Sequence, residues 1–440
     1  MKIRRLQLKN NEYSLLFQIA LIIFAITVCS YGLNQLGIMD QYRDFANVIL
    51  IGSISILLFV QFSQFLISTL ERGIILAGYI IRILVAWIDI YAADYITVLH
   101  SGDDSIAFWN VSLEIKRTGD AFRASAYSRL LSKFFGCYGE NRFLAQYVNI
   151  LCFLGVAIIV IAICKEVQIK KKYQVWILAF ISFLPNYICL SSILLRESFM
   201  IFADTLAFLC FIQWMKKGAF SNFILAFLCV LPAVIMHSVS VGMWVAFFII
   251  GMLWDYRKQK MKVSLKTAIM LIAAAGVLTV FEAVPALRDI LLLYFPSELS
   301  VQSITGKYFV PGGSDYLTGI EVTTWGGLLF WTPIRMLYFL LSPMPTDWRG
   351  IGDMAAFAID SVPIIVFVAG ILKGLKKNRN KSYVYAGLLC CLIITGIFAW
   401  GVTNAGTAMR HRALLIGVFA VTYCISKGEK AISEGDKCDS

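Results

Sequence analysis

Charged residues are scarce in this 440-residue sequence: Asp, Glu, Lys and Arg make up only 15% of it, whereas 59% is hydrophobic. Soluble domains carry about 25% charged and about 45–50% apolar residues, so water cannot be the solvent for most of this chain. Many apolar runs have the length, about 17–25 residues, that a helix needs to cross a bilayer. The residue alternation of a membrane β-barrel is missing. The sequence therefore predicts an all-α, polytopic integral membrane protein with about 12 transmembrane helices.

The motifs of soluble catalysts are also missing. There is no P-loop, GxSxG, HExxH or dinucleotide-binding fingerprint, which excludes ATP-driven transport by this chain alone. The 11 cysteines form no CxxC pair, and most lie in apolar runs, where a thiol packs as a small hydrophobic group. The net charge of +12 comes from short basic clusters beside apolar runs, not from a contiguous basic surface, which excludes nucleic acid as a partner.

The apolar runs define the expected spans, which together form a single transmembrane domain over residues 1–440. The first run follows a basic N-terminal stretch, is too long for a signal peptide and lacks a small-residue cleavage site, so we expect it to remain uncleaved. The spans are expected near residues 13–37, 46–69, 73–96, 143–166, 173–191, 197–215, 219–236, 238–254, 264–283, 353–374, 382–402 and 411–426.

Clusters of Lys and Arg set the orientation of these spans, because cytoplasmic loops are enriched in basic residues. The clusters lie at residues 2–9, 165–172, 216–217, 255–266 and 373–381. Placing all of them inside predicts that both chain ends, including a tail at 427–440, are cytoplasmic.

If residues 325–342 formed a full span, the basic 373–381 segment would lie outside the membrane, against the orientation that the other basic clusters indicate. We therefore expect a re-entrant or interfacial helix on the outer side, broken by Pro333 and ended by Pro343 and Pro345.

The outer face then carries two long loops, 97–142 and 284–352, the second of which contains the re-entrant segment. Two stretches of the first loop, Asp104–Lys116 and Phe122–Phe135, show helical apolar spacing, which predicts short amphipathic helices on the membrane surface. Loops of this length are usually functional.

Two adjacent carboxylates, Asp103 and Asp104, follow the third expected span in the sequence Ser101-Gly102-Asp103-Asp104. Such a pair can bind a divalent cation through oxygen ligands, or one member can act as a general base toward an acceptor hydroxyl. The structural alternative is a glycine turn followed by an acidic helix N-terminus, which the helix dipole favours.

Arg196 and Glu197 begin the sixth expected span near the outer interface, and Asp204 lies two turns deeper on the same face as Glu197. A guanidinium there can hold a phosphate through two hydrogen bonds; alternatively, Arg196 is an interfacial anchor paired with Glu197. Asp204 has no such structural explanation, because a charge inside a span is costly and usually functional.

Three further basic residues, Arg410, His411 and Arg412, are expected in the outer loop before the last span, against the positive-inside bias. They suggest an anionic ligand, for which phosphate or pyrophosphate is the natural candidate; a compact turn with exposed charges is the alternative. Arg335, in the proline-containing segment 325–342, either faces a cavity or extends along the interface to water.

Three other polar residues of the expected spans and their ends have weaker functional signals. His237, at the outer end of a helical hairpin, is more often a satisfied polar residue than a base or ligand. Arg82 and Asp89 lie on one face of the third span, seven residues apart. They either pair with each other or with Asp204 as structural charges, or act directly.

The order of the motifs resembles that in bacterial envelope-glycan membrane proteins. GDD after the early spans, LLRES at a helix start, a Pro-Arg segment ending in SPMPTDW, and NAGTAMRHR before the last span are similar to O-antigen and capsule repeat-unit polymerases and to GT-C glycosyltransferases of lipid-linked sugars. The resemblance implies polysaccharide biosynthesis from a glycan on an undecaprenyl phosphate or pyrophosphate carrier, at the outer face of the bacterial plasma (inner) membrane. Membrane lipids and other polysaccharide-assembly proteins are the implied partners.

The resemblance also implies roles for individual residues. The outer-loop carboxylate that activates the acceptor hydroxyl corresponds to Asp103 or Asp104. Outer-facing arginines, here Arg196 and Arg410 or Arg412 with Arg335 as an additional one, would hold the pyrophosphate leaving group in a partly dry site. The implied substrate-binding residues are Arg196, Glu197, Arg335, Arg410, His411 and Arg412. We expect no cofactor, and the acidic pair can hold a divalent cation. GT-C transferases usually carry their acidic loop after the first span; here it follows the third, which favours a polymerase.

A lipid-linked oligosaccharide flippase is the main alternative from another functional class. A flippase would line a central cavity with charges along its depth, and it usually has two related halves, whereas the unusual charges of this sequence gather toward one face. A glycan acyltransferase fits less well, since His237 is poorly placed as a base within a span. A non-enzymatic scaffold is also a less favoured alternative.

Overall fold

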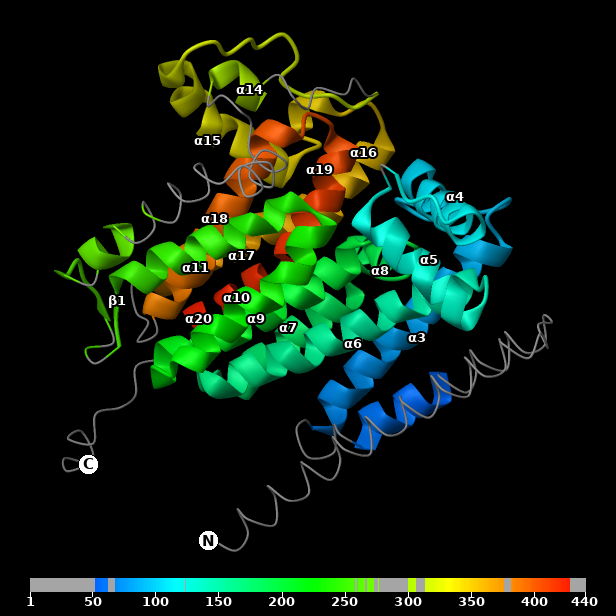
Figure 1. Ribbon diagram of the computed structural model, residues 1–440, viewed down its shortest axis with the longest axis horizontal. Helices are drawn as coiled ribbons and strands as arrows, with labels where there is room; N and C mark the ends of the chain where they lie inside the picture. Colours follow the sequence, from blue (N-terminus) through cyan, green and yellow to red (C-terminus); the bar gives the residue numbers. More distant parts are fainter. Residues whose placement is uncertain are drawn as a thin grey trace, which may run out of the picture. The chain divides into compact units, whose positions relative to one another are not determined.

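Figure 1 shows the computed structural model of the chain. The structure describes residues 52–61, 68–122, 124–256, 258, 260–265, 267–272, 276, 300–305, 313–375 and 381–427. The expected span at 13–37, most of the expected span at 264–283 and nearly all of the expected tail at 427–440 lie outside the described residues.

The described residues are mainly helical (Figure 1). An unlabelled helix covers Gly52–Gln61. The labelled elements of the first half are α3 (Thr69–Tyr91), α4 (Asp103–Thr118), α5 (Ala126–Tyr138), α6 (Arg142–Glu166), α7 (Lys171–Phe183), α8 (Pro185–Leu190), α9 (Glu197–Lys217), α10 (Phe220–Met236), η1 (Ser238–Ser240) and α11 (Val241–Leu253). The later elements are β1 (Trp254–Asp255), β2 (Lys260–Met261), α14 (Val301–Thr305), α15 (Trp325–Leu341), η2 (Pro345–Asp347), α16 (Ile351–Ala356), η3 (Phe357–Ser361), α17 (Val362–Leu375), α18 (Lys381–Gly401), α19 (Ala405–Arg412), η4 (Ala413–Leu415) and α20 (Ile416–Ser426).

Six described helical segments are long and apolar enough to cross a membrane. They are Thr69–Tyr91, Arg142–Glu166, Glu197–Lys217, Ile351–Leu375, Lys381–Gly401 and Ala405–Ser426. Strand structure among the described residues is limited to the two-residue antiparallel pair of β1 and β2. The all-α membrane class is therefore confirmed, while a total of about 12 spans stays a prediction.

At two prolines the helices differ from the expectation. The expected span 173–191 is interrupted at Leu184, whose extended backbone precedes Pro185, because a residue before proline avoids the helical region. By contrast, α15 runs through Pro333 without a break and ends at Ser342, before Pro343. The expected break at Pro333 is wrong: one proline removes a single backbone hydrogen bond, and apolar helices tolerate that loss when neighbours pack around them.

The chain divides into two compact units, the first comprising residues 1–154 and 188–196. Within it, α4 and α5 lie side by side through edge-on aromatic contacts, with ring centroids 5.0 Å apart for both Phe108–Tyr127 and Trp109–Phe135. The hydroxyls of Tyr79 in α3 and Tyr147 in α6 are hydrogen-bonded at 3.0 Å. The two helices expected in segment 97–142 are thus present as α4 and α5, and their position on a membrane surface stays a prediction.

The second unit comprises residues 155–187 and 197–440. In it α9 packs against α10 and α20, and α18 packs against α11 and α20 (Figure 1). Two of these contacts depend on glycine: a Cβ atom on Gly417 would overlap the Thr205 hydroxyl, and one on Gly387 would overlap the Thr422 hydroxyl. Small residues of this kind let apolar helices approach closely where hydrophobic burial gives no driving force in lipid.

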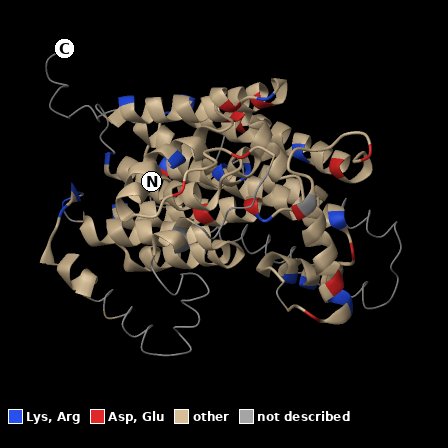
Figure 2. Ribbon diagram, turned by 90° about the horizontal axis from the view of Figure 1, so that it is seen from above, with Lys and Arg blue, Asp and Glu red and all other residues tan. Residues whose placement is uncertain are grey.

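Lys, Arg, Asp and Glu residues make up a small part of the ribbon in Figure 2. Asp204 is nevertheless inside α9, only 2% exposed, and accepts a 3.1 Å hydrogen bond from the Ser240 hydroxyl. This position within α9 agrees with the expectation that Asp204 lies inside a span.

We expect Gly417→Ala to destabilise the second unit by about 1–3 kcal/mol, the usual cost of overpacking, because the added methyl group overlaps Thr205. Thermal unfolding of the detergent-solubilised protein measures the effect. Gly396→Ala in α18 is the matched control, since a Cβ atom there meets nothing within 4 Å. Equal unfolding temperatures for the two variants would contradict the close contact of α20 with α9.

Candidate functional site

The segment NAGTAMRHR forms a helix, not the expected outer loop. The side chain of Asn404 accepts hydrogen bonds from the backbone N–H groups of Gly406 and Thr407 and thereby caps α19, which continues through η4 into α20. The expectation of a loop is wrong because this cap satisfies the first free N–H groups of the helix.

Arg410 and Arg412 point to different sides of α19, because two residues along a helix rotate the side-chain direction by about 200°. Arg410 Nε donates to Glu197 Oε1 at 2.6 Å, and Glu197 is buried at the start of α9. Arg412 Nε donates to Asp360 Oδ2 in η3, and both of these residues are buried. The two arginines therefore anchor α19 to two separate elements of the second unit.

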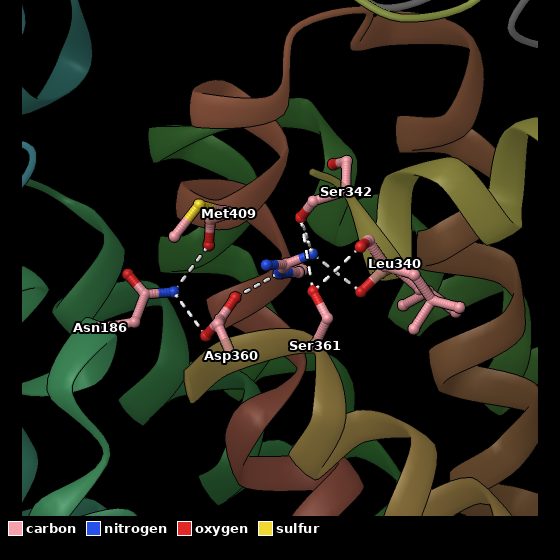
Figure 3. A network of polar contacts seen from close by, with 8 residues as sticks. Asn186, Leu340, Ser342, Asp360, Ser361 and Met409 are labelled. Atoms are coloured by element: carbon pink, nitrogen blue, oxygen red, sulfur yellow. Dashed lines mark hydrogen bonds and ion pairs between the residues drawn. The ribbon is translucent and has the colours of Figure 1, made fainter. Parts of the chain in front are cut away.

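Asp360 is the centre of a buried polar network (Figure 3). Its other carboxylate oxygen accepts from Asn186 Nδ2 at 3.0 Å, and the same amide nitrogen donates to the Met409 carbonyl at 2.8 Å. Asp360 lies in a π-helical segment, η3, which continues into α17. Single π-turns within α-helices frequently mark functional sites.

Arg412 also fixes the end of α15. Its Nη1 atom donates to the carbonyl oxygens of Leu340 at 2.8 Å and Ser342 at 2.7 Å (Figure 3). The Ser361 hydroxyl donates to the adjacent Leu341 carbonyl at 3.0 Å. These bonds satisfy carbonyl groups that the helix end leaves without an intrahelical donor. Arg412 Nη2, however, has no hydrogen-bond partner among the described residues.

Arg335 is a buried cation of a different kind. It is 7% exposed, and its guanidinium lies 4.5 Å from the centre of the Trp400 ring. Trp400 is held in turn by a 2.9 Å hydrogen bond from its indole N–H to Thr332. Within the described part of the chain no carboxylate forms an ion pair with Arg335, and its Nε atom has no hydrogen-bond partner. A cation–π contact supplies about 2 kcal/mol or more when desolvated, less than a counter-charge would.

The Tyr316 phenol is close enough to Arg335 and Arg412 to be affected by their charges. Its hydroxyl donates to the Val402 carbonyl at 3.0 Å, and its backbone N–H donates to the Thr403 carbonyl. Burial raises the pKa of the Tyr316 phenol, and the positive charges of Arg335 and Arg412 oppose that rise. The phenol therefore stays neutral and does not compensate the positive charge of Arg335.

His411 contacts aromatic rings. Its imidazole stacks on Phe398 with the ring centroids 4.8 Å apart, and it meets His237 edge-on at 5.5 Å. His237 Nδ1 accepts from the Val239 backbone N–H at 3.3 Å, which caps η1. The cap requires Nδ1 to be unprotonated, so His237 carries a structural task, and the role expected for His411 stays a prediction.

The remaining predicted residues lie in the first unit. Asp103 and Asp104 are the first two residues of α4, after Gly102, and Asp104 is exposed. This is the acidic helix N-terminus that was the structural alternative for the pair, and it leaves a general-base role open. The Arg196 guanidinium lies 5.8 Å from the Phe108 ring of α4. The described residues contain no group of three or more His, Cys, Asp or Glu side chains that could hold a metal ion.

Arg82 and Asp89 make contacts with other residues. Arg82 donates to Ser191 at 2.6 Å and lies 3.5 Å over the Phe153 ring. Asp89 accepts from Gln146 at 2.6 Å and pairs with Arg142 at 3.3 Å. Ser191 and Arg142 were not among the sequence candidates.

The sequence candidates also omitted Asp360, Asn186, Tyr316 and Trp400. Of these, only Asp360 had a usable signal: it is a carboxylate inside the apolar run 353–374, the criterion that singled out Asp204. Asn186, Tyr316 and Trp400 are ordinary residue types in their local sequence.

Residues 132–295 match the family model of dolichyl-phosphate-mannose-protein mannosyltransferases. The match covers somewhat more than a third of the chain and includes Arg196, Glu197 and Asp204. No curated protein and no solved structure matches the chain. The similarity supports a membrane glycosyltransferase of the GT-C type, which takes its sugar from a lipid-linked donor.

We expect Asp360→Ala to cost about 3–5 kcal/mol of stability, because it leaves the buried Arg412 without a counter-charge. The double variant Asp360→Leu, Arg412→Met should recover most of this loss, since an apolar pair needs no neutralisation. Chemical unfolding in detergent measures both effects. Asp353→Ala is the control, because that carboxylate accepts from an exposed backbone N–H of Arg349. An Asp360→Ala variant as stable as the control would contradict a neutralising role for Asp360.

Proposed function

We propose that this protein is a bacterial cell-envelope glycosyltransferase that uses a glycan on undecaprenyl phosphate or pyrophosphate at the outer face of the plasma membrane. Within this class we favour a repeat-unit polymerase over a single-sugar transferase, because the acidic pair follows the third expected span. The single observation that carries the proposal is Arg335, a buried guanidinium without an acidic partner among the described residues.

The charges around Arg335 support an anionic ligand. Arg410 and Arg412 are each paired with a carboxylate, Glu197 and Asp360 respectively. Among the described residues no carboxylate forms an ion pair with Arg335, and an unpaired buried ion is costly. A phosphate oxygen near Arg335 would supply the missing charge and hydrogen-bond acceptor.

The chemistry that follows is displacement at the anomeric carbon of the lipid-linked sugar. An acceptor hydroxyl forms the new glycosidic bond while the bond from the anomeric carbon to the phosphate oxygen breaks. The hydroxyl proton goes to a general base. The bonding electrons leave with the lipid phosphate, whose added negative charge Arg335 and Arg412 stabilise. This assignment extends the implied roles by making Arg335 the principal phosphate ligand.

Arg335→Ala is expected to lower transfer about 10²–10³-fold, the usual effect of removing one preorganised donor from developing charge. Arg335→Lys should retain part of the activity, because it keeps a point charge but loses the planar fork and the ring contact. The length distribution of surface polysaccharide on a gel measures polymerisation in cells. Arg349→Ala, an exposed arginine that follows the same helix, is the control and should leave the ladder unchanged.

Deletion of the gene distinguishes the classes of activity. Collapse of the polysaccharide ladder to one repeat unit is the result we expect. Loss of a single decoration would contradict polymerisation but retain transfer, and accumulation of lipid-linked units on the cytoplasmic side would contradict both and indicate a flippase.

The proposed orientation is tested by cysteine labelling in a background without the native cysteines. Asp104→Cys and Glu321→Cys, both at exposed positions, should react with an impermeant maleimide added outside, whereas Lys217→Cys should react only after the membrane is opened. Reaction of all three positions from the same side would contradict an active site at the outer face.

A further inference from the structure

The C-terminal ends of α17 and α20 contact each other closely. A Cβ atom on Gly370 would overlap the Tyr423 ring, and one on Gly374 would overlap a backbone carbonyl of α20. The two glycines are four residues apart, the spacing that lets apolar helices approach closely in lipid. The contact brings together two cations: Lys373 in the last turn of α17 and Lys427, the first residue after α20.

Lys427 lies against α17 although a second cation is close by. Its Nζ atom donates to the Gly370 carbonyl at 3.1 Å and lies 4.8 Å from the centre of the Tyr423 ring. Partial burial lowers the pKa of the Lys427 ammonium, and the positive charge of Lys373 lowers it further. The two ammonium groups therefore repel each other, and an anion between them would relieve the repulsion.

The two lysines lie at the end of the second unit where other basic residues gather. Near the end of α20, the Cys424 thiol donates to the Tyr173 carbonyl in the first turn of α7, next to the basic segment 165–172. Lys216, at the end of α9, donates to the Glu166 carbonyl at 2.6 Å. Three basic segments that the sequence assigns to the cytoplasmic side, 165–172, 216–217 and 373–381, therefore meet at one end of this unit.

The lysines at this end differ in whether they are neutralised. Lys216 and Lys217 pair with Glu166 at 3.1 and 3.7 Å. Among the residues that the structure describes, no carboxylate forms an ion pair with Lys373 or Lys427. Both ammonium groups can be reached from solvent, since Lys373 is exposed and Lys427 is partly exposed. The pair is thus an accessible site of uncompensated positive charge.

The surroundings of the pair are those of a bilayer interface. Trp176 of α7 is 44% exposed and lies 5.4 Å from the Tyr423 ring, and aromatic side chains of this kind are enriched at the level of lipid headgroups. Leu372, directly before Lys373, is 57% exposed, which suits contact with acyl chains. Basic pockets between transmembrane helices on the cytoplasmic side bind anionic headgroups.

We propose that Lys373 and Lys427 bind the phosphate of an anionic phospholipid in the membrane leaflet at this end of the second unit. The exposed apolar side chains beside the lysines favour a phospholipid over a soluble anion, because they give its acyl chains a surface to pack against. The site lies thirteen residues along the helix from Asp360, about 20 Å. It therefore adds a lipid-binding site at the other end of α17 and does not depend on the activity proposed above.

Titration of the full-length protein in detergent with phosphatidylglycerol, followed by native mass spectrometry, tests the proposal. We expect phosphatidylglycerol to bind more tightly than phosphatidylcholine, which has no net charge. Lys373→Gln and Lys427→Gln should each weaken the binding of phosphatidylglycerol about fivefold, which corresponds to about 1 kcal/mol for each basic residue. Lys427→Arg should retain binding, because it keeps the charge.

The matched control is Lys217→Gln, which removes the same charge at the same end but from a residue that Glu166 already neutralises. It should leave the affinity unchanged. Lys373→Gln changes an exposed side chain and is the variant to rely on if Lys427→Gln lowers the unfolding temperature. Equal affinity for the two phospholipids, or an equal loss in Lys217→Gln and Lys373→Gln, would overturn the proposal.

Two other anions are distinguished by the same titration. Inorganic phosphate that displaces phosphatidylglycerol at equal concentration would indicate a soluble anion and overturn the choice of a lipid. Residues 428–440 contain four carboxylates, those of Glu429, Glu434, Asp436 and Asp439. Changing all four to amides should leave the affinity unchanged. A fivefold gain in affinity would show that this segment of the chain competes for the lysines, and would overturn the proposal.

Discussion

A guanidinium removed from water must be neutralised, and this requirement organises the second unit. Arg410 and Arg412 meet it with buried carboxylates on other elements, so each ion pair also fixes the position of α19. Such pairs contribute little net stability over an apolar replacement, because desolvation offsets most of their attraction. These ion pairs instead specify which elements pack against α19. Arg335 does not meet the requirement within the described residues, which is why it, and not the ion-paired arginines, indicates a ligand.

The local structure of the chain explains how these charges come together. The Asn404 cap starts α19 early enough to place Arg410 and Arg412 in its last turn, where cations interact favourably with the helix dipole. The π-helical segment η3 carries Asp360 within an otherwise apolar span, where Asn186 holds its second oxygen. Because both carboxylate oxygens of Asp360 are hydrogen-bonded, the orientation of its ion pair with Arg412 is fixed. Arg412 is thereby held with its Nη1 atom toward the end of α15.

Much of the fold was predictable because hydropathy depends on local sequence, whereas the partners of the site depend on tertiary structure. Apolar runs predicted the positions of α3, α6, α9 and α18, and helical spacing predicted α4 and α5. Charge against the topological bias singled out Arg410 and Arg412, and the proline-containing segment singled out Arg335; all three are in the second unit. The local sequence does not predict that Glu197 pairs with Arg410, 213 residues away, or that Asp360 pairs with Arg412. The turn expected before α20 was wrong because a single side chain, Asn404, decides between loop and helix there.

The similarity to mannosyltransferases covers one part of the chain, whereas Arg335 and Arg412 lie in another. Because the two observations are separate, together they strengthen the argument for a lipid-linked donor. The matched stretch ends at residue 295, before Tyr316, Arg335, Asp360 and Arg412. A chance likeness among apolar helices would give no reason for the unmatched remainder to hold a buried guanidinium without a carboxylate partner among the described residues. A lipid-linked donor is consistent with both observations. In the proposed function, the donor phosphate supplies the negative charge that Arg335 lacks.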